Sequence, residues 1–237
     1  YEEVLEGSEQ KILTRFVEIV KERDPDVLEG HNIFGFDIPY IIKRAHKFGI
    51  PLVLGRDGSE LHFGQKRNVA VGGYSKSFTP AHATGRHFID TLLAVQRYDI
   101  TKGRLERYGL KEVAKAFGIA EPDRVLIPGG EIADLYLRDP EMVRIYNLQD
   151  VRETRKLSTI VCQSEFYTTS MIPDNYETVS VSGNGEKINT IMIREYLRQG
   201  KAIPFQRDAK QVPGGFTDIC ATGLLRNVVK CDVESLY

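Results

Sequence analysis

Hydrophobic side chains recur every three or four residues between residues 8 and 23, a spacing that predicts an amphipathic helix. Its inward positions are Ile12, Leu13, Phe16, Val17 and Val20. Ser8 can cap the start of this helix, and Asp24-Pro25 ends it. An apolar run at residues 27–29 then predicts a strand, and a second helix is expected over residues 37–49. The chain therefore opens with a helix, followed by a strand, loop and helix unit.

The pattern changes after the second helix. Residues 56–86 are rich in Gly, Ser, His and Thr with isolated apolar residues, which predicts an irregular hairpin or loop insertion. A strand is expected over residues 87–89, helices over 91–98 and 110–117, and a long helix from Asp139-Pro140 onward. The candidate inward positions of the long helix are Met142, Val143, Ile145, Tyr146, Val151, Leu157 and Ile160. Alternating strands and helices favour an α/β domain.

After about Thr169 the composition shifts, because Pro, Asn and Gly become frequent. One amphipathic helix is expected over residues 186–199, and the apolar residues 227–231 read as an unfinished strand. We find no internal repeat and no low-complexity tract. The sequence thus predicts a main domain over residues 1–168 and a smaller α+β segment over residues 169–237.

Composition and charge exclude only a few classes of protein. A chain of 237 residues with 41% apolar residues can bury one sizeable core. The net charge of −1 gives no polycationic signal, so a nucleic-acid contact would depend on local basic groups and metal ions. No apolar run approaches the roughly 20 residues of a membrane span and no signal peptide opens the chain, so we expect an intracellular, cytoplasmic or nucleoid-associated protein with no membrane partner. The chain has an odd number of cysteines, and their spacing is not that of a metal site. We expect all three to be reduced, buried thiols: Cys162, Cys220 and Cys231.

Two short motifs carry candidate chemistry. Segment 30–40, GHNIFGFDIPY, places Asp37 at a junction between strand and helix, where a carboxylate could bind Mg²⁺. A helix cap before Pro39 explains the same residue equally simply. In the long helix, Tyr146 and Asp150 share one face, which suits a metal-bound carboxylate beside a hydroxyl that orients water. A half-buried tyrosine beside a solvated aspartate fits as well, although Asp150 has no basic partner at helical spacing.

The two motifs together are more informative than either alone. In this order, Asn32-x3-Phe36-Asp37 and Tyr146-x3-Asp150 resemble the second and third exonuclease motifs of the B-family DNA polymerases. Residues 21–49, 85–90 and 108–114 resemble further stretches of that family, so the resemblance covers nearly the whole chain. Residues 232–237, DVESLY, match the start of its Asp-x-x-Ser-Leu-Tyr-Pro-Ser palm motif.

The resemblance implies a ribonuclease-H-like exonuclease domain, with a mixed sheet and flanking helices, that hydrolyses the terminal phosphodiester with two metal ions. Asp37 and Asp150 would be ligands of Mg²⁺ or Mn²⁺, and Tyr146 would position the nucleophilic water. Asn32 and Phe36 would line the path of the unpaired 3′ strand.

The resemblance also implies a polymerase site near the end of the chain. Asp232 would be a metal ligand there, and Tyr237 would pack beneath the sugar and exclude ribonucleotides; alone, the two would read as a strand-end Asp and a core aromatic. The parent protein would extend primer–template DNA with deoxynucleotides and edit single-stranded 3′ ends, while binding to a sliding clamp stays open. Val212 stands where the family often has the Tyr of a Tyr-x-Gly-Gly loop, which leaves open a role for that loop in coordinating synthesis with editing.

The family's first exonuclease motif, Asp-x-Glu, has no counterpart before Asp37. Asp232-Val233-Glu234 fits the pattern literally, but the Ser-Leu-Tyr that follows assigns it to the palm. We therefore expect an exonuclease domain truncated at its N-terminus. Because two of four carboxylates would be missing, the isolated chain should bind Mg²⁺ poorly and be weakly active or inactive.

Three alternatives remain open. The first is a stand-alone exonuclease of the same fold, against which the palm-like ending argues. The second is a catalytically decayed DNA-binding module, although Asp37, Tyr146 and Asp150 are all present. The third is a general α/β metal-binding hydrolase, which would not predict the ending.

Overall fold

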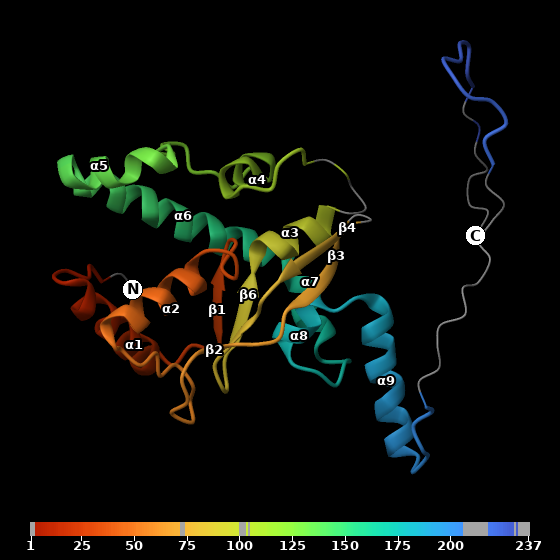
Figure 1. Ribbon diagram of the computed structural model, residues 1–237, viewed down its shortest axis with the longest axis horizontal. Helices are drawn as coiled ribbons and strands as arrows, with labels where there is room; N and C mark the ends of the chain where they lie inside the picture. Colours follow the sequence, from red (N-terminus) through yellow and green to blue (C-terminus); the bar gives the residue numbers. More distant parts are fainter. Residues whose placement is uncertain are drawn as a thin grey trace. The chain divides into compact units, whose positions relative to one another are not determined.

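The computed structural model describes residues 3–71, 74–99, 103, 105–205, 218–229 and 231. The chain divides into two compact units, Tyr1–Ala202 and Ile203–Tyr237, and the helices and strands of the described residues all lie in the first unit (Figure 1). In chain order they are α1 (Glu9–Arg23), β1 (Val27–Gly30), α2 (Asp37–Phe48), β2 (His62–Phe63), β3 (Arg67–Val71), β4 (Tyr74–Phe78), β5 (Ala81–His82), β6 (His87–Asp90), α3 (Thr91–Asp99), α4 (Leu110–Ala116), a 3₁₀ turn (Gly129–Glu131), α5 (Ile132–Arg138), α6 (Pro140–Val161), α7 (Gln163–Thr168), α8 (Tyr176–Val181) and α9 (Asn184–Arg198).

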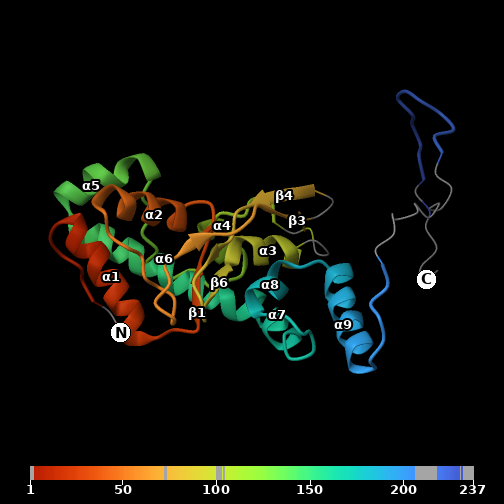
Figure 2. The same cartoon turned by 60° about the horizontal axis from the view of Figure 1, so that its bottom comes forward.

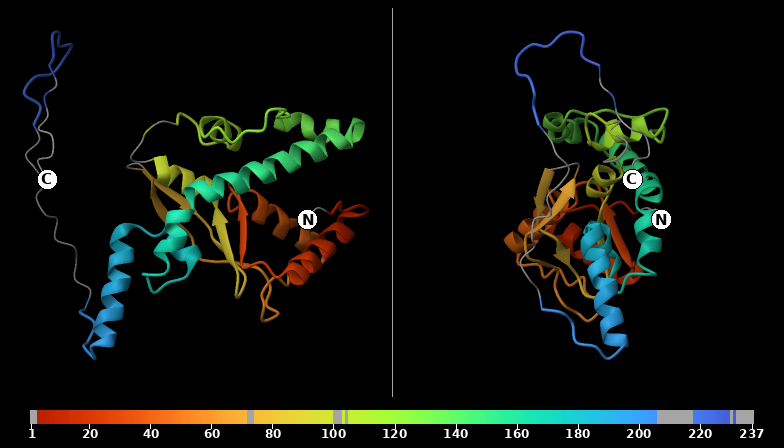
Figure 3. Two further views of the ribbon diagram at one scale, coloured as in Figure 1. Left: turned by 180° about the vertical axis from the view of Figure 1, so that it is seen from behind. Right: turned by 90° about the vertical axis from the view of Figure 1, so that its right-hand side faces the viewer.

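Two strands far apart in the sequence, β1 and β6, pair in parallel at the centre of this unit. Their side chains alternate between two faces, as the period of a strand requires. Leu28 and Phe88 pack with α1 and α2, whereas Val27 and Ile89 pack with residues of α3, α4 and α6. Accordingly, α6 runs along one side of the strand pair and α1 and α2 lie on the other (Figures 1 and 3). The two hydrophobic cores therefore meet at this pair of strands.

The segment between β1 and β6 folds back on itself in two antiparallel pairs. β3 pairs with β4 (Figure 2). β2, which precedes this hairpin, pairs with β5, which follows it. The predicted hairpin insertion at residues 56–86 is confirmed. Together with the parallel β1–β6 pair and the flanking helices, these pairs make the unit an α/β domain, as predicted. The described strands are parallel in one pair and antiparallel in two, but they form three two-stranded sheets rather than the single mixed sheet that was predicted.

The first two helices begin and end where the sequence predicts. The Ser8 hydroxyl accepts a hydrogen bond from the backbone N–H of Lys11 at 3.4 Å, and Asp24 ends α1 in a left-handed conformation with φ of 44°. α2 ends at Gly49, whose φ of 64° costs glycine little. These capping residues set both ends of α1 and the C-terminal end of α2.

The predicted inward face of α6 is partly wrong. Leu157 is buried, but the side chains of Met142, Ile145, Val151 and Ile160 are exposed. The buried face instead holds Gln149, Glu153, Thr154 and Ser158. Periodicity missed this face because polar partners from outside the helix, Arg124 and Glu29, hydrogen-bond to it.

Several predictions concern the end of the chain. Asn227–Val229 is not a strand, since no described strand pairs with it and Val228 and Val229 are 71% and 81% exposed. Val212, Asp232 and Tyr237 lie outside the described residues. The predicted boundary after residue 168 coincides with the end of α7, inside the first compact unit, and the division into an exonuclease domain and a palm segment stays a prediction.

The cysteines divide into two kinds. Cys162 is buried, as predicted, but Cys220 and Cys231 are exposed, so that part of the prediction is wrong. Both exposed cysteines lie in the second unit, where the described residues are exposed and do not join the hydrophobic cores. No helix in the described part of the chain is both long and apolar enough to cross a membrane.

Phe88 lies where the two cores meet and is 1% exposed, so we expect Phe88→Ala to lower the free energy of unfolding by about 3 to 5 kcal/mol. Phe205→Ala, at a side chain that is 91% exposed, should change it by less than about 0.5 kcal/mol. Urea unfolding followed by circular dichroism measures both. Similar values for the two variants would contradict the assignment of Phe88 to the core.

Burial raises the pKa of the Cys162 thiol from 9.0 to about 11. At pH 8 only about one thiol in a thousand is then ionised, so iodoacetamide should alkylate Cys220 and Cys231 much faster than Cys162, as read by peptide mass spectrometry. Because the folded pKa exceeds the unfolded one, the contribution of Cys162 to stability is complete below pH 9 and declines toward pH 11. Rapid alkylation of Cys162 in the folded chain at pH 8 would refute its burial.

Candidate active site

The loop between β1 and α2 presents the first motif. Asn32 adopts a left-handed conformation with φ of 66°, and its carbonyl accepts hydrogen bonds from the backbone N–H groups of Gly35 and Phe36, both at 3.0 Å. A Cβ at position 35 would lie 2.4 Å from the Asn32 side-chain oxygen, so a larger residue there would displace the Asn32 side chain. This tight turn makes Phe36 the N-cap of α2 and Asp37 its first residue.

Asp37 and Asp150, which are more than a hundred residues apart in the sequence, line one pocket of about 540 Å³. Its lining includes apolar side chains from both strands, Leu28 and Phe88. Further polar residues of its wall are Glu29, His31, Asn147, Thr154 and Arg155. Three carboxylates among apolar side chains form a concave site of the kind that binds ligands.

The electrostatics of Asp37 favour a positive ligand. Partial burial at the pocket raises the pKa of its carboxyl group above the ordinary value, and the nearby negative charge of Asp90 raises that pKa further. A cation beside Asp37 would offset both effects. Perturbed carboxyl groups in a cleft are candidates for a functional site.

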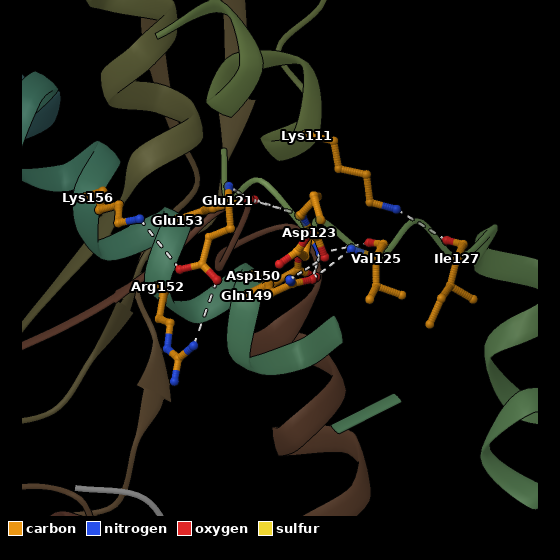
Figure 4. A network of polar contacts seen from close by, with 11 residues as sticks. Lys111, Glu121, Asp123, Val125, Ile127, Gln149, Asp150, Arg152, Glu153 and Lys156 are labelled. Carbon is orange, nitrogen blue, oxygen red and sulfur yellow. Dashed lines mark hydrogen bonds and ion pairs between the residues drawn. The ribbon is translucent and has the colours of Figure 1, made fainter. Parts of the chain in front are cut away.

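Asp150 is held by a charged network (Figure 4). The guanidinium group of Arg124 donates to Asp150, to Glu153 at 3.1 Å and to Gln149 at 3.2 Å. The Arg124 side chain is 10% exposed and that of Glu153 is fully buried. The sequence offered Asp150 no basic partner on its own helix; the partner comes instead from the loop before α5. Asp150 is therefore an oriented carboxylate rather than a freely solvated one.

Tyr146 lies beneath two cations and outside the pocket of Asp37. The Lys111 ammonium lies 4.7 Å and the Arg124 guanidinium 5.0 Å from the centre of its ring. Tyr146 lines a different pocket, between α5, α6 and residues 3–7. The structure thus links Tyr146 to Asp150 through Arg124, and a role for Tyr146 in positioning water stays a prediction.

Asn32 and Phe36 do not line the pocket either, but Phe36 is well placed beside it. Its ring is 64% exposed and lies parallel to that of Tyr40, with 6.0 Å between the ring centres and 9° between the planes. Two exposed, stacked rings next to Asp37 form a surface on which nucleobases can stack. Tyr40 did not figure among the predicted site residues.

A magnesium ion fits the donor set of this pocket. Among the described residues no three His, Cys, Asp or Glu side chains are close enough to hold a metal ion alone. However, Mg²⁺ is commonly held by one or two carboxylates, with waters and substrate phosphates as its remaining ligands. Asp37 and Asp150 suit that arrangement.

The sequence analysis missed Arg124, Lys111 and Asp90. Asp90 could have been found, because it directly follows a predicted strand, residues 87–89, and the carboxyl ends of parallel strands meet at one edge of a sheet. Arg124 and Lys111 carry no local signal, since they belong to segments whose path depends on the packing of α4 and α6.

Comparison with known proteins identifies relatives of this sequence. The profile of the DNA polymerase family B exonuclease domain matches residues 3–113. A DNA polymerase of Archaeoglobus fulgidus is 30% identical over 240 residues, which cover 99% of this chain and 28% of that polymerase. A DNA polymerase of Thermococcus litoralis is 28% identical, covering 98% of this chain and 13% of that protein.

This chain is also similar to a solved polymerase structure. The family B DNA polymerase of Pyrobaculum calidifontis superposes with a TM-score of 0.69 and 28% sequence identity. The alignment covers 90% of this chain and 27% of that polymerase. The chain therefore spans less than a third of the length of these relatives.

Arg124 neutralises two carboxylates in a nearly solvent-free site, so we expect Arg124→Met to lower the free energy of unfolding by about 3 kcal/mol by leaving the buried Glu153 unpaired. Arg144→Met, which breaks the exposed pair with Glu141 on the same helix, should cost less than about 1 kcal/mol. Chemical unfolding of the two variants side by side measures the difference. Equal, small losses would mean that the Arg124 network does not hold α6.

Proposed function

The chain belongs to the family B DNA polymerases, and from that premise we propose that its first unit acts in 3′-to-5′ proofreading, the hydrolysis of the terminal phosphodiester of a DNA strand. One observation carries the proposal. Asp37 and Asp150, from two motifs far apart in the sequence, line a single pocket.

In the proposed reaction the pocket receives the single-stranded 3′ end of DNA. The stacked rings of Phe36 and Tyr40 hold unpaired bases, and the left-handed turn at Asn32 keeps these rings beside Asp37. Asp37 and Asp150 hold Mg²⁺ or Mn²⁺, which supplies activation of water and stabilisation of the leaving 3′ oxygen.

Arg124 has a supporting role in this scheme. Its hydrogen bonds to Asp150 and Glu153 restrict the carboxylate that holds the metal, and its cation lies over the ring of Tyr146. We propose that Tyr146 orients the attacking water from its place one helical turn before Asp150. A ligand fixed by neighbouring hydrogen bonds needs little reorganisation when the metal and DNA bind.

For the parent protein we also propose DNA synthesis. Its relatives are named DNA polymerases, so we propose that primer–template DNA and deoxynucleotides are its substrates, with Asp232 as a metal ligand and Tyr237 as the residue that excludes ribonucleotides. Val212 leaves open the role of the loop before that site.

We propose that this chain alone hydrolyses DNA weakly. The resemblance to the family implies four motif carboxylates, and the described pocket contains two of them, Asp37 and Asp150, beside Glu29, which belongs to neither motif. With fewer anionic ligands, Mg²⁺ keeps more of its water and binds less tightly.

The first test is direct metal binding to the purified chain. Titration with Mn²⁺, followed by electron paramagnetic resonance, should show that Asp37→Asn and Asp150→Asn each weaken binding by about tenfold, because each removes an anionic ligand. Asp134→Asn, at an exposed carboxylate of α5, serves as the control and should leave the affinity unchanged. Equal affinity of all four proteins would contradict a metal site in this pocket.

The second test is release of labelled nucleotide from a single-stranded 3′ end with Mg²⁺ or Mn²⁺. We expect little release by the chain, and no further loss in Asp150→Ala. Robust release that Asp150→Ala abolishes would support the hydrolytic function and refute weak activity. Unaltered DNA binding and metal binding in Asp37→Ala and Asp150→Ala would favour a decayed DNA-binding module.

A further inference from the structure

We infer that Asp90, which belongs to neither motif, is a positioning residue for the loop that carries Asp37; this inference rests on the proposed function. Asp90 is the last residue of β6 and lies opposite Gly30, the last residue of β1. The parallel register therefore places its side chain at the strand edge from which the loop of residues 31–36 departs.

The Asp90 carboxylate binds the backbone of this loop directly. One oxygen accepts hydrogen bonds from the N–H groups of Asn32 and Leu92, both at 2.9 Å, and the other accepts from Phe34 at 3.4 Å. Asp90 is 6% exposed, so water competes little for these bonds. Hydrogen bonds from several N–H groups to one buried carboxylate are charge-assisted and stronger than neutral ones.

The neighbouring residue, Thr91, makes a second attachment. The His31 Nε2 lies 2.8 Å from the Tyr108 carbonyl oxygen, which can only accept, so this nitrogen carries a proton. The Thr91 hydroxyl lies 3.0 Å from Nδ1 of the neutral imidazole and 3.3 Å from the Gly30 carbonyl oxygen, and these two acceptors share its single proton. Thr91 is fully buried. Residues 90 and 91 thus hold three residues of the loop, His31, Asn32 and Phe34.

This attachment determines where Asp37 lies. From Phe34 the chain reaches the first turn of α2 within three residues, and the N–H of Ile38 closes back on the Ile33 carbonyl at 3.0 Å. Asp90 itself does not line the pocket, and both of its oxygens are used by backbone donors. Asp90 therefore acts on Asp37 through the backbone of the loop. This support matters because a metal ligand must be held to within about 0.5 Å of its working position.

Glu177 provides a matched comparison. It is also a buried carboxylate that accepts from a backbone N–H of β6, that of Phe88 at 3.0 Å, but it lines a different pocket beside His82. In Asp90→Asn, the amide N–H₂ replaces one of the two carboxylate oxygens and faces the backbone N–H of either Phe34 or Asn32. Two donors cannot hydrogen-bond to each other, so at least one of these hydrogen bonds is lost. Glu177→Gln can keep its bond to Phe88 through the amide oxygen. Thermal unfolding of both variants measures the loss of stability that a purely structural role would produce.

The test measures two quantities on the purified chain. Mn²⁺ affinity should fall by about tenfold in Asp90→Asn and stay unchanged in Glu177→Gln, as for residues that orient metal ligands from behind. Amide hydrogen exchange, read by NMR without metal, should accelerate at Asn32, Phe34 or both in Asp90→Asn alone.

The outcomes separate this inference from the proposed function. If Asp37→Asn weakens Mn²⁺ binding but Asp90→Asn does not, the metal site stands and the positioning role is overturned. If no variant alters Mn²⁺ binding, the proposed metal site fails and hydrogen exchange decides: unchanged exchange at Asn32 and Phe34 in Asp90→Asn overturns the role of Asp90, and faster exchange supports it.

Discussion

The parallel pairing of β1 with β6 is the constraint on which the rest of the first unit depends. Its register sets Leu28 beside Phe88 on one core and Val27 beside Ile89 on the other, so α1 and α2 pack on one face and α6 on the opposite face. The same register ends both strands at one edge, where the loop of residues 31–36 begins. Core and site are therefore consequences of a single set of backbone hydrogen bonds.

Both motif carboxylates are supported by a side chain outside their own motif. Asp90 holds the loop before Asp37, and Arg124 holds Asp150 through a network that also satisfies Glu153 and Gln149. This explains why the buried face of α6 is polar. A buried carboxylate without partners would be costly, but once satisfied its hydrogen bonds restrict both the helix and the Asp150 carboxylate to one geometry.

The family B exonuclease relatives give these contacts a functional context. A site that hydrolyses single-stranded DNA needs an anionic centre for metal ions and exposed rings for unpaired bases. Asp37 belongs to the proposed anionic centre and directly follows Phe36, one of the exposed rings. Phe36 and Tyr40 stack at the start of the same helix whose first residue lines the pocket. A single helix end thus couples base stacking to the proposed metal site.

The sequence by itself determined the local elements and motif residues: the caps at Ser8 and Gly49, the strands around residues 27 and 88, and the candidates Asp37, Tyr146 and Asp150. These depend on near neighbours in the chain, through spacing, capping and backbone preference. Tertiary structure alone decided that Asp37 and Asp150 share a pocket while Tyr146 lies outside it, that α6 buries polar residues, and that Cys220 is exposed. Tertiary structure also brought in Arg124 and Asp90. The partners of a buried charge can lie anywhere along the chain, so the local periodicity of the sequence does not predict them.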